Sequence, residues 1–204
     1  VPMLPTVLSE DLCSLKAGKL RYAFVMHANF KDRMTDGSFE LASITYENAM
    51  IRVKTNYAYE DKTLLKSDDY ALLKQIAQTL DKECVDSHDS HEVVATFMKF
   101  MNKSCAETLA TMNTGIFRNQ KGGPERMSNS TEGGPLSSSH RTSNSTEGGI
   151  LSATYSTENE GHAHMGLSHY THITSPIRRL VDLINMRILM NGSKIDLESS
   201  NIEK

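Results

Sequence analysis

"HYTHITSPIRRLVDLINMRIL", residues 169–189, combines a proline, two adjacent arginines and an apolar run with helical spacing. The spacing predicts a helix that begins near Pro176, because Thr174 or Ser175 can cap it and proline suits its first position. One face of this helix is expected to carry Ile177, Leu180, Val181, Ile184 and Ile188. The Asn-Gly pair at 191–192 predicts its C-terminal end.

Arg178 and Arg179 fall in the expected first turn of this helix, where the helix dipole disfavours each positive charge by about 0.3–1 kcal/mol. A bound phosphate would remove that cost, because both the free backbone N–H groups and the guanidinium fork bind anions. The alternative is an i,i+4 ion pair between Arg178 and Asp182 on a solvated face. The spacing alone favours neither interpretation.

The first half of the chain carries strand patterns. Apolar residues alternate in "LRYAFVMHANF" (20–30) and in "MIRVKTNYAY" (50–59), and a turn at 36–37 leads into "SFELASIT" (38–45). These patterns predict a small antiparallel sheet. Arg52 and Lys54 on its exposed face are candidates for contact with an RNA backbone, although solvated charges on strands are common.

Helical spacing follows the strands. Ser67 is a candidate N-cap for a helix whose apolar positions are Leu72, Leu73, Ile76 and Leu80. A second helix is predicted over Ser90 to Thr111, with its Met-rich stripe serving as core. The predicted fold class is therefore α+β, with a small antiparallel sheet in the first half packed by helices.

Residues 119–149 lose this periodicity and contain two similar copies, "SNSTEGGPLS" and "SNSTEGGILS". Their Gly, Ser, Thr and Asn content is typical of a linker or a long surface loop. The sequence is thus divided into an N-terminal segment (1–118), a low-complexity repeat linker (119–149) and a C-terminal segment (150–204).

Composition limits the classes of partner. The net charge is −3, from 22 Lys and Arg against 25 Asp and Glu, so any site for a polyanion has to be local. Cys13, Cys84 and Cys105 form no paired motif and are read as free thiols, which indicates a reducing compartment, cytoplasmic or nuclear. No apolar run approaches the ~18 residues of a membrane span, so no membrane partner is expected.

"YTHITSPIRRLVDL" (170–183) resembles the signature of the ribonuclease II/R family, the RNB domain. The matching positions are Tyr170, Thr174, Ser175, Pro176, Ile177, Arg178, Arg179, Asp182 and Arg187. Other family segments are resembled by "VPMLPTVLSEDLCSLKAGKLRYAF" (1–24), "FMKFMNKSCAETL" (97–109), "GIFRNQ" (115–120) and "ATYS" (153–156). The chain therefore resembles the C-terminal part of an RNB-type catalytic domain.

The resemblance implies 3′-to-5′ hydrolysis of single-stranded RNA to nucleoside monophosphates, with Mg²⁺ in the complete enzyme. It assigns Arg178 to the scissile phosphate as the catalytic arginine. It makes Arg179 a supporting phosphate or structural contact, and it gives Tyr170, Thr174 and Ser175 the task of positioning the loop and the RNA backbone. Single-stranded RNA is the implied partner, together with the N-terminal part of the same domain or a larger RNA-decay complex.

Departures from the family pattern bear on catalysis. The family's metal-binding aspartates precede the segment at which this chain begins, Ala95 or Thr96 stands where an acidic residue is usual, and Met186 replaces a histidine. We therefore expect RNA binding at most, with no hydrolysis and no metal, from this chain alone. A non-catalytic RNA-binding or scaffold protein derived from the family is the alternative, and a purely structural role would follow if RNA affinity were negligible at low salt.

Two groups of metal-ligand residue types were weighed. His162, His164, His169 and His172 lie close together in the sequence, but their spacing fits no zinc template and no cysteine is near. "DSHDSH" (86–91) precedes a predicted helix, where Asp and Ser commonly cap. Neither group is predicted to bind a metal.

Overall fold

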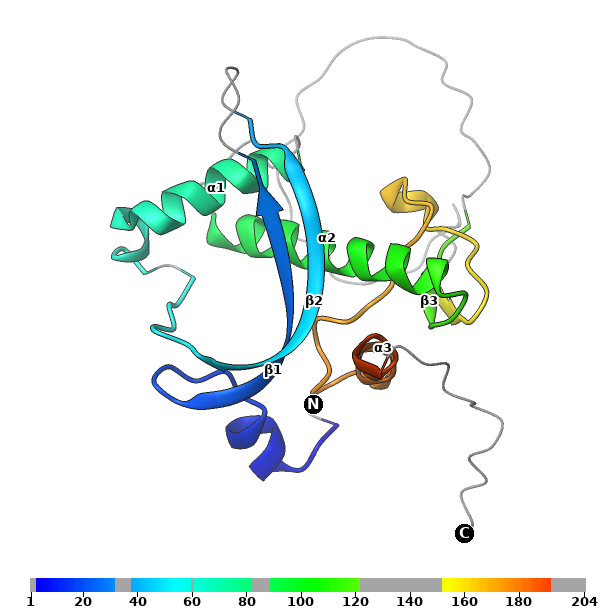
Figure 1. Ribbon diagram of the computed structural model, residues 1–204, viewed down its shortest axis with the longest axis horizontal. Coiled ribbons are helices and arrows are strands. Elements are labelled where there is room, and N and C mark those ends of the chain that lie inside the picture. Colours follow the sequence, from blue (N-terminus) through cyan, green and yellow to red (C-terminus); the bar gives the residue numbers. More distant parts are fainter. Residues whose placement is uncertain (1–2, 32–37, 60, 82–88, 122–151, 192–204) are drawn as a thin grey trace, which may run out of the picture.

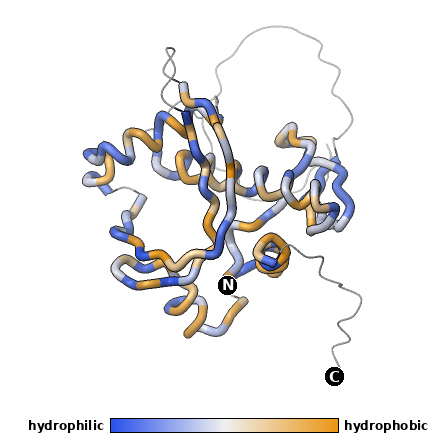
Figure 2. Tube along the Cα trace, in the orientation of Figure 1, coloured by the Kyte–Doolittle hydropathy of each residue, from blue (hydrophilic) through white to orange (hydrophobic). Residues whose placement is uncertain are grey.

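A long antiparallel hairpin forms the first half of the protein. The computed structural model describes residues 3–31, 38–59, 61–81, 89–121 and 152–191, and in it strand β1 (Leu20–Phe30) pairs with β2 (Leu41–Arg52). Figure 2 shows that the hairpin carries both hydrophobic and hydrophilic residues.

The second strand ends earlier than its sequence pattern suggests. Thr55 and Tyr57, which continue the alternation, lie beyond Arg52 and outside β2. The reason is a competing contact, because the Asn56 side chain accepts from Ala17 N (2.7 Å) and donates to Leu15 O (3.1 Å). The predicted turn at 36–37 lies outside the described residues.

Two helices follow the hairpin with the bounds that periodicity indicated. Helix α1 (Asp68–Leu80) begins at Ser67, whose hydroxyl accepts from Tyr70 N at 3.4 Å. Helix α2 (Ser90–Thr111) is capped by Asp89, which accepts from His91 N at 2.8 Å. Both caps satisfy backbone N–H groups that have no partner within their helix.

Helix α2 is the central element, as Figure 1 shows. Its N-terminal half contributes Val93 to a buried apolar cluster with Tyr70 and Ala77 of α1. Its C-terminal half contributes Ala106 and Leu109 to a second cluster. The other buried members of that second cluster are Phe117 and Ile188. The hairpin lies on the same helix, since Ile44 and Tyr46 of β2 share a pocket with Ser104, Glu107, Thr108 and Thr111.

A second, shorter strand pair joins residues on both sides of the repeat segment. Strand β3 (Phe117–Asn119) pairs antiparallel with β4 (Thr154–Ser156). Asn119, where the linker was predicted to start, is thus the last residue of β3, and residues 122–151 lie outside the described part. The remaining elements are the short helices η1 (Val7–Leu12), η2 (Leu64–Lys66) and η3 (Ala163–Met165) and helix α3 (Leu180–Asn191). The predicted α+β class, with an antiparallel sheet in the first half, is confirmed.

The N-terminal segment lies beside α3 (Figure 1). Met3 N donates to Ile177 O at 3.0 Å, and the Arg21–Asp11 ion pair (2.7 Å) holds η1 against β1. The start of the described chain is therefore adjacent to the turn that carries Arg178.

The other sequence predictions concern cysteines and membranes. Cys13 is an exposed free thiol and Cys105 a buried one, whereas Cys84 lies outside the described residues. Within the described ranges, no helix combines the length and the apolar character needed to cross a membrane.

Candidate functional site

The two adjacent arginines lie in a turn before α3, not in its first turn. The helix starts at Leu180, and the N–H groups of Arg178 and Arg179 both donate to Ser175 O, at 3.2 and 3.1 Å. The prediction that the helix begins near Pro176 is therefore wrong by about one turn. Leu180, expected on the buried face, is 57% exposed.

Asp182 explains the late start. Its carboxylate is fully buried, and Oδ1 accepts from Ser175 N at 2.7 Å, which turns the preceding segment back toward the helix. The buried positions of α3 are consequently Asp182, Asn185 and Ile188. Two polar residues thus occupy a face that would otherwise be apolar.

Arg179 is the ion-pair partner of Asp182. Its Nη2 lies 2.8 Å from Oδ1 and its Nε 2.8 Å from Oδ2, so the guanidinium spans both carboxylate oxygens. The alternative considered from the sequence, a solvated pair between Arg178 and Asp182, is wrong in both its residue and its setting. The charge of Arg179 is already balanced inside the protein.

Arg178 is exposed and differently placed. Its Nη2 donates to Ser175 Oγ at 3.2 Å, and no ion pair joins it to any carboxylate in the described part of the chain. Most of its N–H donors and its full positive charge therefore face outward beside a structural arginine. This arrangement suits capture of a phosphate.

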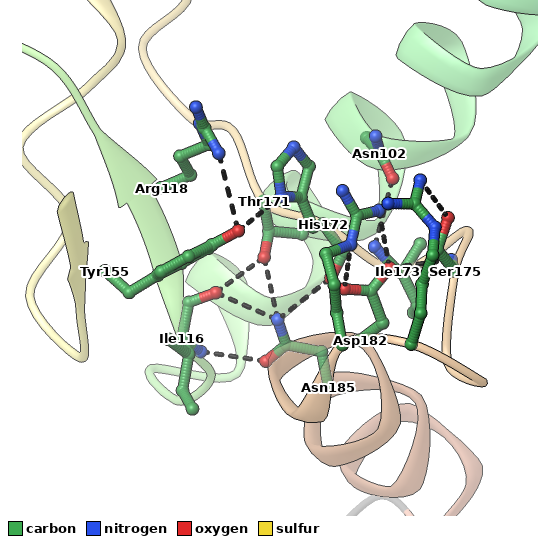
Figure 3. A network of polar contacts seen from close by, with 12 residues as sticks. Asn102, Ile116, Arg118, Tyr155, Thr171, His172, Ile173, Ser175, Asp182 and Asn185 are labelled. Carbon is green, nitrogen blue, oxygen red and sulfur yellow. Dashed lines mark hydrogen bonds and ion pairs between the residues drawn. The ribbon is translucent and has the colours of Figure 1, made fainter. Parts of the chain in front are cut away.

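A buried polar network holds the segment before the turn (Figure 3). Asn185 Oδ1 accepts from Ile116 N (2.8 Å), and its Nδ2 donates to Ile116 O (2.9 Å) and Thr171 Oγ1 (2.7 Å). Asn102 Oδ1 accepts from Ile173 N at 3.1 Å. Residues of α2 and α3, together with Ile116 just before β3, thus fix the backbone that leads to the arginines.

These asparagines were not singled out from the sequence. A signal was present, because Asn102 is spaced four and seven residues from the buried Ala106 and Leu109, which places it on the core face of α2. Asn185 similarly follows Asp182 and precedes Ile188 at helical spacing. A polar residue at such positions indicates a buried hydrogen-bond partner.

The other residues predicted to contact RNA differ in their exposure and in how near they lie to the turn. Tyr170 is only 4% exposed and its hydroxyl accepts from Asn102 Nδ2 at 3.2 Å, so the structure gives it a packing role in place of direct RNA contact. Thr174 and Ser175 lie on the approach to Arg178, and Ser175 touches it. Arg52 and Lys54 are exposed at the base of the hairpin, and no described hydrogen bond or ion pair joins them to this turn.

Metal-ligand residues do not converge in the described ranges, where no group of three or more His, Cys, Asp or Glu could hold an ion. The histidines serve other contacts, with His172 bonded to Tyr155 and His169 to Ser168. Asp86 and His88 lie outside the described residues. The residues that the structure describes therefore do not form a Mg²⁺ site.

Known proteins resemble the chain in sequence and in fold. The chain is 25% identical to Ribonuclease R of Chlamydia pneumoniae over an alignment of 261 positions, which covers 96% of the chain and 38% of that relative. The chain thus spans well under half the length of this protein.

Solved structures share the fold. RNase R of Mycoplasma genitalium in complex with double-stranded RNA superposes with a TM-score of 0.69 at 19% identity, over 93% of this chain and 45% of that one. The Dss1 exoribonuclease of Candida glabrata, an active-site mutant, gives 0.68 at 17% identity, over 91% and 32%. The model of the RNB domain family matches residues 1–83 and 67–193. With most of its length matched in this way, the chain belongs to the RNB domain family.

Proposed function

We propose that this chain is the arginine-bearing, C-terminal part of a 3′-to-5′ exoribonuclease catalytic domain acting on single-stranded RNA. The proposal rests on one observation: the two arginines differ in their ion-pair partners and in their exposure to solvent. Arg179 is balanced by the buried Asp182, whereas Arg178 is exposed beside it without a carboxylate partner among the described residues.

Arg178 then serves as the phosphate-binding group. Its planar fork can donate two hydrogen bonds to one phosphate, and such donors stabilise the charge that develops on a phosphoryl group during hydrolysis. Ser175 limits the rotation of the side chain, since its hydroxyl accepts from Nη2. Thr174 and Ser175 position the turn, while Arg52 and Lys54 provide more distant contacts to the RNA backbone.

Hydrolysis, in this proposal, belongs to the complete domain with its Mg²⁺ and carboxylates. The Met3–Ile177 hydrogen bond supports this view, because a chain arriving at Met3 from its N-terminal side enters beside Arg178. The 204-residue chain alone is expected to bind RNA without cleaving it.

The test uses the whole chain, Mg²⁺ and a labelled single-stranded RNA with a free 3′ end. We expect binding that Arg178→Ala weakens by about tenfold, since a hydrogen-bonded charge contact is lost. Lys103→Ala is the matched control, because Lys103 lies on α2 with Glu107 as its partner at 3.8 Å.

Two outcomes would contradict the proposal. Stepwise shortening of the RNA that Arg178→Ala abolishes would refute the expectation of binding without hydrolysis. Absence of binding at low salt, where phosphate contacts are strongest, would refute the RNA-binding role itself.

A further inference from the structure

A second arginine lies near the turn, within a chain of polar contacts from three segments (Figure 3). Arg118 of β3 donates through Nη1 to the Tyr155 hydroxyl of β4 at 3.4 Å, and its guanidinium carbon lies 5.8 Å from the centre of the Tyr155 ring. The same hydroxyl lies 2.6 Å from His172 Nδ1. None of these contacts was foreseen from the sequence.

The direction of the hydrogen bonds follows from the charge of His172. Burial, and then the nearby Arg179 and Arg118, lower the pKa of His172 to about 4, so its ring is neutral at neutral pH. Arg118 can only donate, so the Tyr155 oxygen accepts from it and the Tyr155 O–H donates to Nδ1. The Tyr155 hydroxyl thus donates to His172 and accepts from Arg118, so it links the guanidinium to the segment before the turn.

Arg118 is not neutralised by this arrangement. Its contacts are a phenol and an aromatic ring, and no ion pair joins it to a carboxylate in the part of the chain that the structure describes. Tyr155 is 42% exposed and Arg118 is half-buried, so the pair lies at the surface of the described part of the protein. The remaining N–H donors of Arg118 are available to an anion.

Arg118 also lies on the same side of the fold as the turn before α3. Its charge and that of Arg179 both act on the single imidazole of His172, which requires both guanidiniums to be near that ring. Arg178 is the chain neighbour of Arg179. Arg118 of β3 and Arg179 of the turn are therefore both near His172, and Arg178, which has no carboxylate partner among the described residues, precedes Arg179 in the chain.

We propose that Arg118 binds a second backbone phosphate of the RNA strand that Arg178 contacts, and that Tyr155 and His172 are positioning residues for its guanidinium. The inference rests on the proposed function, since it extends the same RNA-binding site. Two cationic contacts along one strand fix the path of the RNA backbone over this part of the surface. The proposal makes Arg118 a determinant of affinity for the RNA backbone, with no preference for base sequence.

The experiment measures binding of a labelled oligouridylate to the whole chain by fluorescence anisotropy across a range of salt concentrations. We expect Arg118→Ala to weaken binding about tenfold. The slope of log affinity against log salt should become shallower by about 0.7, the value for one phosphate contact on a single strand. Lys103→Ala is the control and should change neither quantity.

Tyr155→Phe tests positioning, because it removes the hydroxyl and keeps the ring. We expect a loss of about threefold. In the double variant with Arg118→Ala, Tyr155→Phe should cause no further loss, since its effect passes through Arg118. Additive losses would overturn the positioning role of Tyr155.

The outcomes separate this inference from the proposed function. If Arg118→Ala binds like Lys103→Ala while Arg178→Ala is weakened, the second phosphate site is refuted and the proposed function stands. If the unaltered chain does not bind RNA at low salt, the proposed function fails and the inference fails with it. Thermal unfolding checks that each variant is folded. Should Arg118→Ala misfold, Arg118→Lys keeps the charge, and we expect about a threefold loss with the salt slope unchanged.

Discussion

The hairpin and the turn before α3 both contain ion pairs of similar length, yet these pairs differ in solvent exposure. On the hairpin, Lys31–Glu40 (2.5 Å) joins side chains that are about half exposed, as does the His27–Glu47 hydrogen bond (2.8 Å). At the turn, the Asp182 carboxylate bound by Arg179 is fully buried. Exposed pairs contribute little to stability, whereas removing one partner of a buried pair leaves an unbalanced charge. The distance between the charged atoms alone therefore does not determine how much each pair contributes to stability.

The largest effect is expected at Asp182. Asp182→Ala leaves the Arg179 guanidinium and Ser175 N–H without their acceptor, and we expect the free energy of unfolding to fall by about 3 kcal/mol. Urea unfolding followed by circular dichroism measures it. Asp11→Ala is the matched control, because Asp11 pairs with Arg21 at 2.7 Å but is itself largely exposed. Equal losses in the two variants would show that burial does not decide the cost.

The second largest loss of stability is expected at Asn185. Asn185→Ala leaves the Ile116 N–H without its acceptor and removes one of the two donors to Ile116 O, the other being the Thr171 hydroxyl. We expect a loss of about 2 kcal/mol in the same assay. Asn29, whose side chain donates to Ser43 on the hairpin at 3.0 Å, provides the exposed counterpart. Asn29→Ala should cost less than about 0.5 kcal/mol, and a larger loss there than at Asn185 would contradict the comparison.

His172 gives a smaller, pH-dependent effect. Burial, and then Arg179 and Arg118, disfavour its protonation more than Asp182 favours it, and the pKa falls from 6.5 to about 4 on folding. Between these values the unfolded chain binds a proton that the folded one does not, so stability falls as pH falls through this window. The ring is partly exposed, so solvent screens its charge. We therefore expect the free energy of unfolding to fall by about 1–2 kcal/mol across this window, less than the full pKa shift would give.

Unfolding measured from pH 7 down to about pH 4 tests this expectation against His172→Gln, which can still accept a hydrogen bond from Tyr155. The variant should lose stability less steeply across the window. Identical pH profiles would exclude His172 as the source of the effect.

The smallest effect is expected on the hairpin. Lys31→Ala removes one member of an exposed pair, and we expect a change within about 0.5 kcal/mol that vanishes at high salt. Glu40→Ala should behave alike. If either variant lowered the free energy of unfolding by more than about 1 kcal/mol, this exposed pair would contribute as much as a buried one, which would contradict the comparison.

The elements that sequence reasoning placed correctly are those whose signals are local. Period-two alternation indicated β1, and helical spacing with a capping serine indicated α1. The bounds of α2 agree because its caps and apolar stripe lie within the helix itself.

Contacts between distant segments could not be read in this way. The bond from Ile173 N to Asn102 spans 71 positions and that from Ile116 N to Asn185 spans 69. The arginines show a subtler limit, because Arg178 and Arg179 stand four and three residues before Asp182, and both spacings permit an ion pair. Only the position at which α3 begins decides between them.

Substitutions at the two arginines should therefore have different effects on the amount of folded protein in a cell. A substitution at Arg179 leaves Asp182 buried without its cation, so we expect less folded protein, faster degradation and partial rescue at lower growth temperature. A substitution at Arg178 leaves folding intact and removes only an outward-facing cation. Its product would accumulate to the normal level. Substitutions at these neighbouring codons would thus be distinguished by the amount of protein in the cell and by its dependence on temperature.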